Sequence, residues 1–423
     1  MTSEKRAWIA ALTGILTIVA AGVCTAPPVW TQPPMAAAGG EILRADGAHL
    51  AVTVPGQAGP VPAKSTRVVY ASTDTHGAPT TAVATYLEPT LPWTGPGPRP
   101  LVAYAGGTQG QGPECAPSAM LAQVVRFQPP ADIVFEYDLI AIYQLLSAGM
   151  AVVMTDYHDF GVPGVHDFLN RRTQGYAVLD SARAAVRLPG LGPDSPVILY
   201  GYSQGAMASA AAAELQAEYA PELNVRGAYV GGPLVGPQEY IARSDGRPGV
   251  APAIAWILNG IAADYPETLP ELDAALNDTG KAIMRDAVGK CGGGLSGIFV
   301  QPQSTTQWTT SGLPLAVVID NSPELKRVFD EQRLGGVRPA APVRVYAARN
   351  DEGAPYPAVR AMAASWCGGG ATVQLDADAT VPPLAGFVGT HDLSFFPSVA
   401  TTQPWMTDRL ANLPAPVNCA ALP

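Results

Sequence analysis

The sequence carries little charge, and its few positive charges are scattered. Of 423 residues 14% are charged, with 25 Lys and Arg against 35 Asp and Glu, which gives a formal net charge of −10. No run of Lys or Arg occurs after residue 6. A nucleic-acid-binding protein needs a basic patch that neutralises phosphates, so we expect no nucleic-acid partner. Because 48% of the residues are hydrophobic, intrinsic disorder is also excluded.

Long apolar runs are scarce as well, and the one present lies at the N-terminus. Lys5 and Arg6 precede an apolar run over residues 7–23, and small residues and prolines follow it. This layout is typical of a secretory signal peptide, so we expect a secreted, extracellular protein whose residues 1–38 form the signal peptide and a flexible arm. An uncleaved membrane anchor is the alternative, because the run is about as long as a short transmembrane helix.

Cysteines are few, with five in the chain. If Cys24 is removed with the signal peptide, four are left, and four can pair completely. An oxidising compartment favours two disulfides, although the sequence alone allows three connectivities and free buried thiols are the alternative. The four cysteines are Cys115, Cys291, Cys367 and Cys419.

Histidine is as scarce as cysteine, with five in the chain. None of the five stands at a metal-ligand spacing from Cys, Asp or Glu, so the sequence indicates no metal and no cofactor. We therefore expect any chemistry to be carried by protein groups alone.

What the chain does contain is a regular alternation of apolar strands with helical stretches. After a Pro-, Ala- and Gly-rich arm over 24–48, two alternating segments at 65–70 and 82–86 predict an antiparallel pair. From residue 100 onward strands and helices alternate, which predicts an α/β fold whose mostly parallel sheet is covered by helices on both faces. The expected strands are 100–104, 149–154, 196–200, 225–230, 343–346 and 372–375, and the expected helices are 137–148, 173–188 and 204–219.

The alternation then stops, and helical stretches at 252–263 and 267–276 follow, with one strand candidate at 315–319. We predict an inserted helical cap or lid. Its apolar residues 254–258 either pack in the core of the cap or line an apolar binding channel. The expected parts of the chain are an α/β core at 39–235 and 331–423 and the cap at 236–330.

A nucleophile motif, Gly-Tyr-Ser-Gln-Gly, occupies residues 201–205 between an expected strand and an expected helix. A serine hydroxyl is a weak nucleophile, and it attacks a carbonyl only when a tight turn raises it beside a base. The two glycines avoid a collision across this sharp corner. The motif therefore predicts Ser203 as the nucleophile of an α/β-hydrolase, with a glycine-rich structural turn as the alternative.

The acid and the base of α/β-hydrolases follow the serine in the order Ser, Asp or Glu, His. Four of the five histidines precede Ser203 and only His391 follows it, so His391 is the predicted base. The acid is expected on a loop just after a strand, and Asp351 follows the strand at 343–346. The alternatives for the acid are Glu352, Asp376 and Asp378.

The reaction also needs hydrogen-bond donors for the negative oxygen that forms on the attacked carbonyl. The backbone N–H of Gln204, directly after the nucleophile, is the first expected donor. The second is expected from the glycine-rich loop that follows the strand at 100–104, and Thr108 or Gln109 is its predicted donor. A simple turn is the alternative for that loop.

These residues and their surroundings resemble the secretory lipase family, a lipase-A-like group of α/β-hydrolases in fungi and actinobacteria. The likeness runs from about residue 101 to the C-terminus. The motifs that carry it are Glu-Cys-Ala-Pro-Ser at 114–118, Gly-Tyr-Ala-Val-Leu-Asp at 175–180, Gly-Tyr-Ser-Gln-Gly-Ala at 201–206, Tyr-Ala-Pro-Glu-Leu-Asn at 219–224 and Gly-Gly-Pro at 231–233.

The resemblance implies the same three triad residues, with the acid in Asn350-Asp351-Glu352. It also implies a helical lid between the strand that follows the helix after Ser203 and the strand before the acid. Related sequences often carry a charged residue or a histidine in the oxyanion loop, and residues 106–109 have neither. The disulfides that the resemblance implies are Cys115 with Cys291 and Cys367 with Cys419.

We expect a secreted carboxylic ester hydrolase, most simply a triacylglycerol lipase or esterase that works through an acyl-enzyme intermediate. Its expected partners are an acyl ester or lipid substrate and a lipid–water interface. An acyltransferase or a serine peptidase on the same fold is the second hypothesis, and an inactive hydrolase fold that serves as a binding module is the third. The sequence does not specify acyl chain length or oligomeric state.

Overall fold

The computed structural model describes residues 38–48, 50, 63–129, 132–158, 160, 165–247, 251–292, 304–384 and 389–422. The expected signal peptide, with Cys24, lies outside these residues. The chain divides into two units, Met1–Ala36 and Ala37–Pro423, and everything below concerns the second. Within the described residues no helix is long and apolar enough to cross a membrane.

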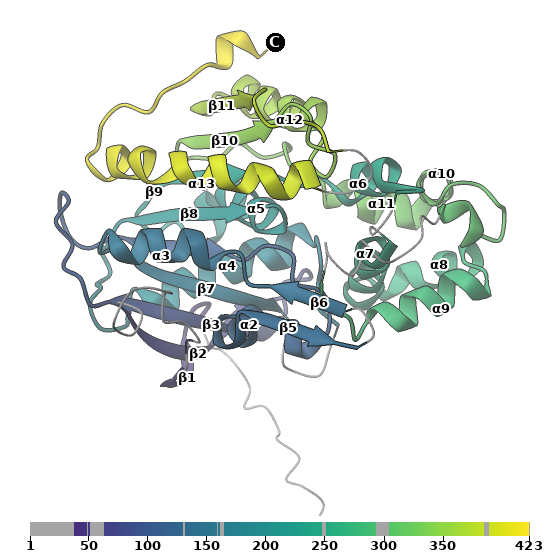
Figure 1. Cartoon of the computed structure of the whole chain (residues 1–423), viewed down its shortest axis with the longest axis horizontal. Helices are drawn as coiled ribbons and strands as arrows, with labels where there is room; N and C mark the ends of the chain where they lie inside the picture. The colour runs from purple at the N-terminus through teal and green to yellow at the C-terminus, as the bar shows by residue number, and fades with distance from the viewer. Residues whose placement is uncertain are drawn as a thin grey trace, which may run out of the picture. The chain divides into compact units, whose positions relative to one another are not determined.

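A nine-stranded sheet runs through this unit in the order β1-β2-β3-β7-β4-β8-β9-β10-β11 (Figure 1). The pairs from β1 to β7 are antiparallel, and all pairs from β7 to β11 are parallel. The predicted mostly parallel sheet is therefore confirmed. The strands are β1 Ile42–Gly47, β2 Ala63–Thr73, β3 Pro79–Pro89, β4 Leu101–Ala105, β7 Ala151–His158, β8 Val197–Tyr202, β9 Val225–Gly231, β10 Val343–Ala348 and β11 Val373–Asp378.

The central strands explain why the sequence revealed them. Every residue of β4, β7 and β8 is buried, because helices cover both faces of the parallel part of the sheet. The edge strand β1 is mostly exposed, so it has no apolar alternation to read. The prediction of a flexible arm over 24–48 was wrong for residues 42–47, since they form β1 and pair with β2.

Two hydrophobic cores lie on the two faces of the sheet. Successive residues of β4 alternate between them: Ala103 joins the core with α4, α5 and α12, whereas Tyr104 joins the core with α3 and α13. Figure 1 shows α3 and α13 crossing the front of the sheet. The helices are α3 Leu139–Ser147, α4 Arg171–Ala185, α5 Gln204–Tyr219, α12 Tyr356–Gly368 and α13 Gly389–Leu410.

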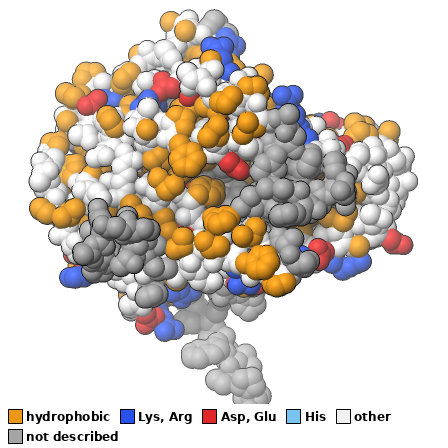
Figure 2. Space-filling view, viewed as in Figure 1, with side chains coloured by type: hydrophobic (Ala, Val, Ile, Leu, Met, Phe, Trp, Pro, Cys, Tyr) orange, Lys and Arg blue, Asp and Glu red, His pale blue; other side chains and the backbone are white. Residues whose placement is uncertain are grey.

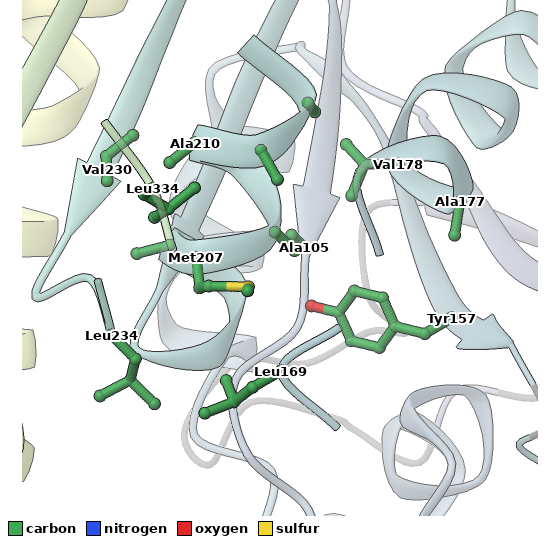
Figure 3. Packing of buried hydrophobic residues seen from close by; sticks show 14 of the residues in the cluster. Ala105, Tyr157, Leu169, Ala177, Val178, Met207, Ala210, Val230, Leu234 and Leu334 are labelled. Atoms are coloured by element: carbon green, nitrogen blue, oxygen red, sulfur yellow. The ribbon is translucent and has the colours of Figure 1, made fainter. Parts of the chain in front are cut away.

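Small residues let α4 and α5 approach each other and the end of β4. A Cβ atom on Gly175 of α4 would come within 3.2 Å of the Cβ atom of Ala211 of α5. In Figure 3, Met207 and Ala210 of α5 and Val178 of α4 surround Ala105, the last residue of β4. The first turn of α5 is therefore held beside the loop that leaves β4.

Between β9 and β10 the described chain forms helices. Residues 254–258 lie in α7 and are all buried, and Trp256 Nε1 donates a hydrogen bond to the Ala287 carbonyl at 2.9 Å. The expected helix at 267–276 is a 3-10 turn, Pro266–Thr268, followed by α8. The helices of this segment are α6 Pro237–Ser244, α7 Ala251–Asp264, α8 Leu269–Ala275, α9 Asp278–Ala287, α10 Leu315–Asp320 and α11 Pro323–Glu331.

The strand candidate at 315–319 was wrong, because these residues form α10. A short apolar run fits a buried helix as well as a strand, and periodicity cannot separate the two over so few residues. Pro314 starts the helix with the fixed φ that the first turn needs, and α10 packs against α6 and α11.

Two further features complete the frame. A two-stranded hairpin, β5 Val125–Gln128 with β6 Asp132–Phe135, follows α2 Pro117–Gln123 and was not predicted, because its strands are very short. The two disulfides, Cys115–Cys291 and Cys367–Cys419, form as the family resemblance implied.

Candidate active site

Ser203 lies on a strained corner between β8 and α5. Its φ is 59° and its ψ is −119°, a conformation that a residue with a side chain adopts only where the surroundings enforce it. A Cβ atom on Gly201 would lie 2.1 Å from the Gly205 carbonyl oxygen, and one on Gly205 would lie 2.0 Å from that of Ala105. Both glycines of the motif are therefore required by the close approach of backbone to backbone.

The structure brings Ser203, His391 and Asp351 into one hydrogen-bonded row. His391 Nε2 lies 2.8 Å from Ser203 Oγ, and His391 Nδ1 lies 2.8 and 3.0 Å from the two carboxylate oxygens of Asp351. All three side chains are buried. They come from the ends of β8 and β10 and from the first turn of α13, which meet at the carboxyl edge of the parallel strands.

The Asp351 carboxylate is fixed from both directions. Besides His391, it accepts backbone N–H bonds from Gly353 at 2.8 Å and from Ala354 at 2.7 Å. Its neighbour Glu352 accepts the N–H of Thr390 at 2.9 Å, which places a carboxylate at the positive N-terminus of α13. Among the residues considered for the acid, only Asp351 contacts the His391 ring in the described structure.

The other two candidates for the acid have partners of their own. Asp376 forms an ion pair with Arg344, and Asp378 accepts hydrogen bonds from Tyr346 and Thr380. Both lie on β11, one strand further along the sheet than Asp351.

The His391 ring is held by a tyrosine and two glycines. The Tyr202 hydroxyl donates to the His391 carbonyl at 2.6 Å, and the two rings lie 5.2 Å apart. Cβ atoms on Gly232 and Gly353 would come within 3.2 and 3.0 Å of the imidazole, so glycine leaves room for it. Sequence reasoning missed the contact of Tyr202, because the central variable positions of the motif give no signal of it.

The electrostatics of the site favour a charged imidazole. Burial lowers the pKa of His391, but the charge of Asp351 and its hydrogen bond outweigh burial and raise that pKa to about 9. His391 must lose this proton before it can act as a base. The row is therefore suited to proton transfer at alkaline pH.

One predicted oxyanion donor, Gln204, directly follows Ser203. Gln204 is the first residue of α5, and its backbone N–H has no hydrogen-bond partner in the described part of the chain, as expected for the first turn of a helix. The loop after β4 is fixed next to it: the Gly106 carbonyl accepts the Tyr157 hydroxyl at 2.6 Å, and the Gly107 N–H donates to Asp138 at 2.8 Å. Thr108 and Gln109 follow in this loop, with Thr108 half-buried.

Buried acids lie behind this loop, and the sequence analysis did not find them. Gln109 Nε2 lies 3.4 Å from a carboxylate oxygen of Glu136, whose other oxygen accepts the Asp138 N–H at 3.2 Å. Burial, followed by the charge of Asp138, raises the pKa of Glu136 well above its usual range. Burial also raises the pKa of Asp138 to about 6, although the Tyr104 hydroxyl and the Gly107 N–H oppose the shift.

A second histidine contacts the site from behind. His166 Nε2 lies 2.9 Å from the side-chain amide nitrogen of Gln204, and His166 Nδ1 lies 3.0 Å from Asp167. His166 precedes Ser203 in the chain and was therefore passed over as a catalytic base. The structure places it against the residue after the nucleophile. No group of three or more His, Cys, Asp or Glu side chains is placed to hold a metal ion within the described residues.

Comparison with known proteins identifies the family of this chain. The model of the family described as "Secretory lipase" matches residues 127–418. The chain belongs to the secretory lipase family. The resemblance inferred from its motifs is therefore confirmed.

Two relatives span most of this chain. "Probable inactive lipase MT1628" of Mycobacterium tuberculosis is 30% identical over 366 residues, which cover 84% of this chain and 75% of that protein. "Lipase A" of Arthroderma benhamiae is 28% identical over 360 residues, which cover 84% of this chain and 72% of that protein. The family and these relatives place the chain among lipase and esterase hydrolases.

A solved structure confirms the α/β-hydrolase fold. The closed state of Candida antarctica lipase A aligns with a TM-score of 0.72 over 92% of this chain and 86% of that one, at 21% identity. At this identity the likeness concerns the fold alone.

Proposed function

We propose that this secretory lipase family protein is an active, secreted carboxylic ester hydrolase, a triacylglycerol lipase or esterase, with Ser203, His391 and Asp351 as its catalytic triad. The observation that carries the proposal is the continuous row of hydrogen bonds from Ser203 Oγ through His391 to Asp351. Each distance lies within the range in which a base can accept the proton of a nucleophile and an acid can orient the base.

The reaction follows from this row. Ser203 Oγ attacks the ester carbonyl carbon while His391 Nε2 takes the hydroxyl proton, and Asp351 stabilises the imidazolium that forms. The tetrahedral intermediate collapses when His391 gives the proton to the departing alcohol oxygen, which leaves the acyl group on Ser203. Water then attacks the acyl-enzyme with His391 as base, and the carboxylic acid leaves.

The negative oxygen of the intermediate is stabilised by the N–H of Gln204 and by a donor from Thr108 or Gln109. Support comes from the contact of Gly205 with the Ala105 carbonyl, which fixes the loop after β4 beside the start of α5. Thr108 is the better donor of the two. The backbone N–H groups of both residues have no partner among the described residues, but the side chain of Gln109 is already engaged by Glu136.

The helices α6 to α11 form the cap or lid expected at 236–330, above an α/β core at 39–235 and 331–423. The end of the oxyanion loop supports this assignment, because Gln111 Nε2 donates to the Trp256 carbonyl at 3.2 Å and Asn259 Nδ2 donates to Gln111 Oε1 at 3.0 Å. These bonds join the loop to α7. Movement of the cap would therefore also shift the oxyanion loop.

Secretion is supported by the two disulfides, which form and persist in oxidising compartments, and by the charged and apolar layout of residues 1–38. An acyl ester or a lipid is the substrate, and contact with a lipid–water interface follows from the low solubility of acylglycerols.

An inactive hydrolase fold is the second candidate, because one relative that spans most of the chain carries the description "inactive". Inactivity on this fold would be explained if a triad member were absent or displaced. Here all three are present and within hydrogen-bond distance of one another.

A panel of p-nitrophenyl esters from short to long chain, run beside an emulsified triglyceride, tests the proposal. We expect hydrolysis by the parent and none above background by Ser203→Ala. An ester turnover by Ser203→Ala equal to that of the parent would refute the triad. The same panel with an added alcohol acceptor, and with amides in place of esters, separates the hydrolase from an acyltransferase or a serine peptidase.

A further inference from the structure

The β5–β6 hairpin turns an apolar face outward. Its register sets Val125 opposite Phe135 and Phe127 opposite Ile133, so these four side chains share one face of the ribbon. Val125 is 44% exposed, Phe127 58% and Phe135 41%. A two-stranded ribbon on a soluble core normally turns its apolar face inward, so this polarity is inverted.

The opposite face of the hairpin already has its partners. Val134 is buried in a small core with Met120 and the Cys115–Cys291 pair, and Arg126 forms an ion pair with Glu114 at 2.7 Å. The hairpin is therefore anchored by this inner face. Its outer aromatic side chains contribute nothing to that core.

The outward apolar face continues onto two helices. Leu393 and Phe396 of α13 are 38% and 54% exposed and stand three residues apart, so they lie on the same side of the helix. Ile140, at the start of α3, is 46% exposed. We call the six side chains Val125, Phe127, Phe135, Ile140, Leu393 and Phe396 the docking face.

The docking face borders the triad. Phe135 stands two residues before Tyr137, whose ring lies 5.3 Å from that of Phe395. Phe395 in turn contacts Phe396 on one side and Tyr202, the neighbour of His391, on the other. Figure 2 shows apolar side chains gathered on this side of the molecule over the hairpin and α13, around a hollow with an acidic side chain at its edge.

The charge around the docking face indicates which kind of surface can bind to it. None of the six side chains is charged, Asp392 is exposed beside Leu393, and the whole chain carries a formal charge of −10. An anionic surface would be repelled, and an uncharged one would be accepted. A second copy of the chain would cover the approach to Ser203, whereas a lipid surface would supply substrate to it.

We propose that the docking face is the surface by which this protein adsorbs to uncharged or zwitterionic lipid–water interfaces, with the triad turned toward the lipid. Aromatic and aliphatic side chains gain free energy when they leave water for the boundary of a lipid layer. The inference rests on the proposed function, because only an enzyme for water-insoluble esters gains from this orientation.

The test measures adsorption separately from catalysis. Flotation of the Ser203→Ala protein with phosphatidylcholine vesicles, with and without Phe127→Ser and Phe396→Ser, gives the partition coefficient while no lipid is consumed. We expect each serine to weaken partition roughly tenfold. Leu413→Ser and Val417→Ser are matched controls, since these residues are 52% and 59% exposed but lie beyond the far end of α13. We expect no change for either.

Three results would overturn the proposal: unchanged partition in the Phe127 and Phe396 variants, stronger and salt-sensitive binding to phosphatidylglycerol vesicles, or light scattering that shows the substitutions break a dimer. Phe127→Ser and Phe396→Ser are also made in the protein that retains Ser203, and their turnover of a soluble short-chain ester reports on folding. We expect this turnover to change far less than the partition coefficient. If the parent hydrolyses no ester, the proposed function fails, whereas the vesicle result still decides whether the face binds lipid.

Discussion

The two sides of Ser203, one formed by α13 and the other by the loop after β4, differ in how their buried carboxyl groups are compensated. On the α13 side, Asp351 carries a charge that His391 and two backbone N–H groups compensate. On the β4 side, Glu136 and Asp138 are buried together, and within the described residues neither forms an ion pair. Charge is therefore retained where the proposed chemistry uses it. On the other side the acids are held toward their neutral forms, and they act as hydrogen-bonding groups that shape a loop.

We expect the largest loss of activity from a substitution on the α13 side. Replacement of His391 by Ala removes the side chain that lies within hydrogen-bond distance of the Ser203 hydroxyl. We expect kcat for a soluble ester to fall by a factor on the order of 10⁴ to 10⁶, as for the loss of a triad base. Steady-state kinetics on a soluble short-chain ester measure kcat. His76→Ala is the control, because this histidine is exposed and far from His391 in the sequence. A fall of less than tenfold would show that another group acts as base.

Asp351→Asn tests the charge on the same side with little change of shape. We expect kcat to fall about 10³- to 10⁴-fold, because the imidazolium loses its compensating charge and the ring its preferred tautomer. Without that charge the pKa of His391 falls, so the rising limb of the pH–rate profile should move to lower pH. Glu352→Gln is the matched control, since it keeps an acceptor for the Thr390 N–H, and we expect its profile to stay within about half a unit of the parent's.

The pH profile of the parent protein follows from the same pair. The base works only without its extra proton, and the pKa of His391 is raised to about 9, so kcat/KM should increase with pH up to about 9. A profile that is already flat above pH 7 would contradict the strong coupling of His391 with Asp351. Titration of the imidazole by NMR in the Ser203→Ala protein provides an independent reading of the same pKa.

The two sides also differ in how far the sequence could reveal them. Ser203 and His391 were predictable because the glycine motif fixes a local turn and because only one histidine follows it. Asp351 was predictable from its place after a buried strand. These are signals of local geometry and of chain order, and the structure brings all three side chains together as expected.

The residues on the β4 side of Ser203 could hardly be predicted from the sequence. Glu136 and Asp138 reach the loop after β4 only through tertiary packing, and nothing in their local sequence marks a carboxyl as buried. His166 meets Gln204 across 38 residues of chain. The helix α10 and the short hairpin were missed for a related reason: over four to six residues an apolar pattern does not determine helix or strand, and the neighbours decide. The fold could be predicted where an element is long enough to show a regular apolar pattern, as in the pair β2 and β3, and not over the shortest segments.

His166 lies where the two sides meet, against the side chain of Gln204. His166→Leu removes the contact with the Gln204 amide, so the first turn of α5 is less firmly held. We expect kcat for a soluble ester to fall about tenfold with KM nearly unchanged, because the loss concerns a donor that acts in the transition state. His166→Gln, which can keep a polar contact, should recover part of the loss. An equal loss in both variants would mean that His166 only fills space.

The smallest expected effect concerns stability on the loop side. The pKa of buried Glu136 is raised above its value in the unfolded chain, so the folded state resists ionisation there. Below the unfolded pKa both states are protonated and nothing is lost, but as the pH rises past it the unfolded chain ionises first and folding becomes less favourable. Glu136→Gln removes this cost and can still accept the Asp138 N–H. We therefore expect the variant to melt a few degrees above the parent at pH 8 and at nearly the same temperature near pH 4.5.

Thermal unfolding at both pH values measures the difference, with the exposed Glu218→Gln as control. A variant that is less stable than the parent at pH 8 would mean that the Glu136 carboxylate is charged and compensated, and the contrast between the two sides of Ser203 would then disappear.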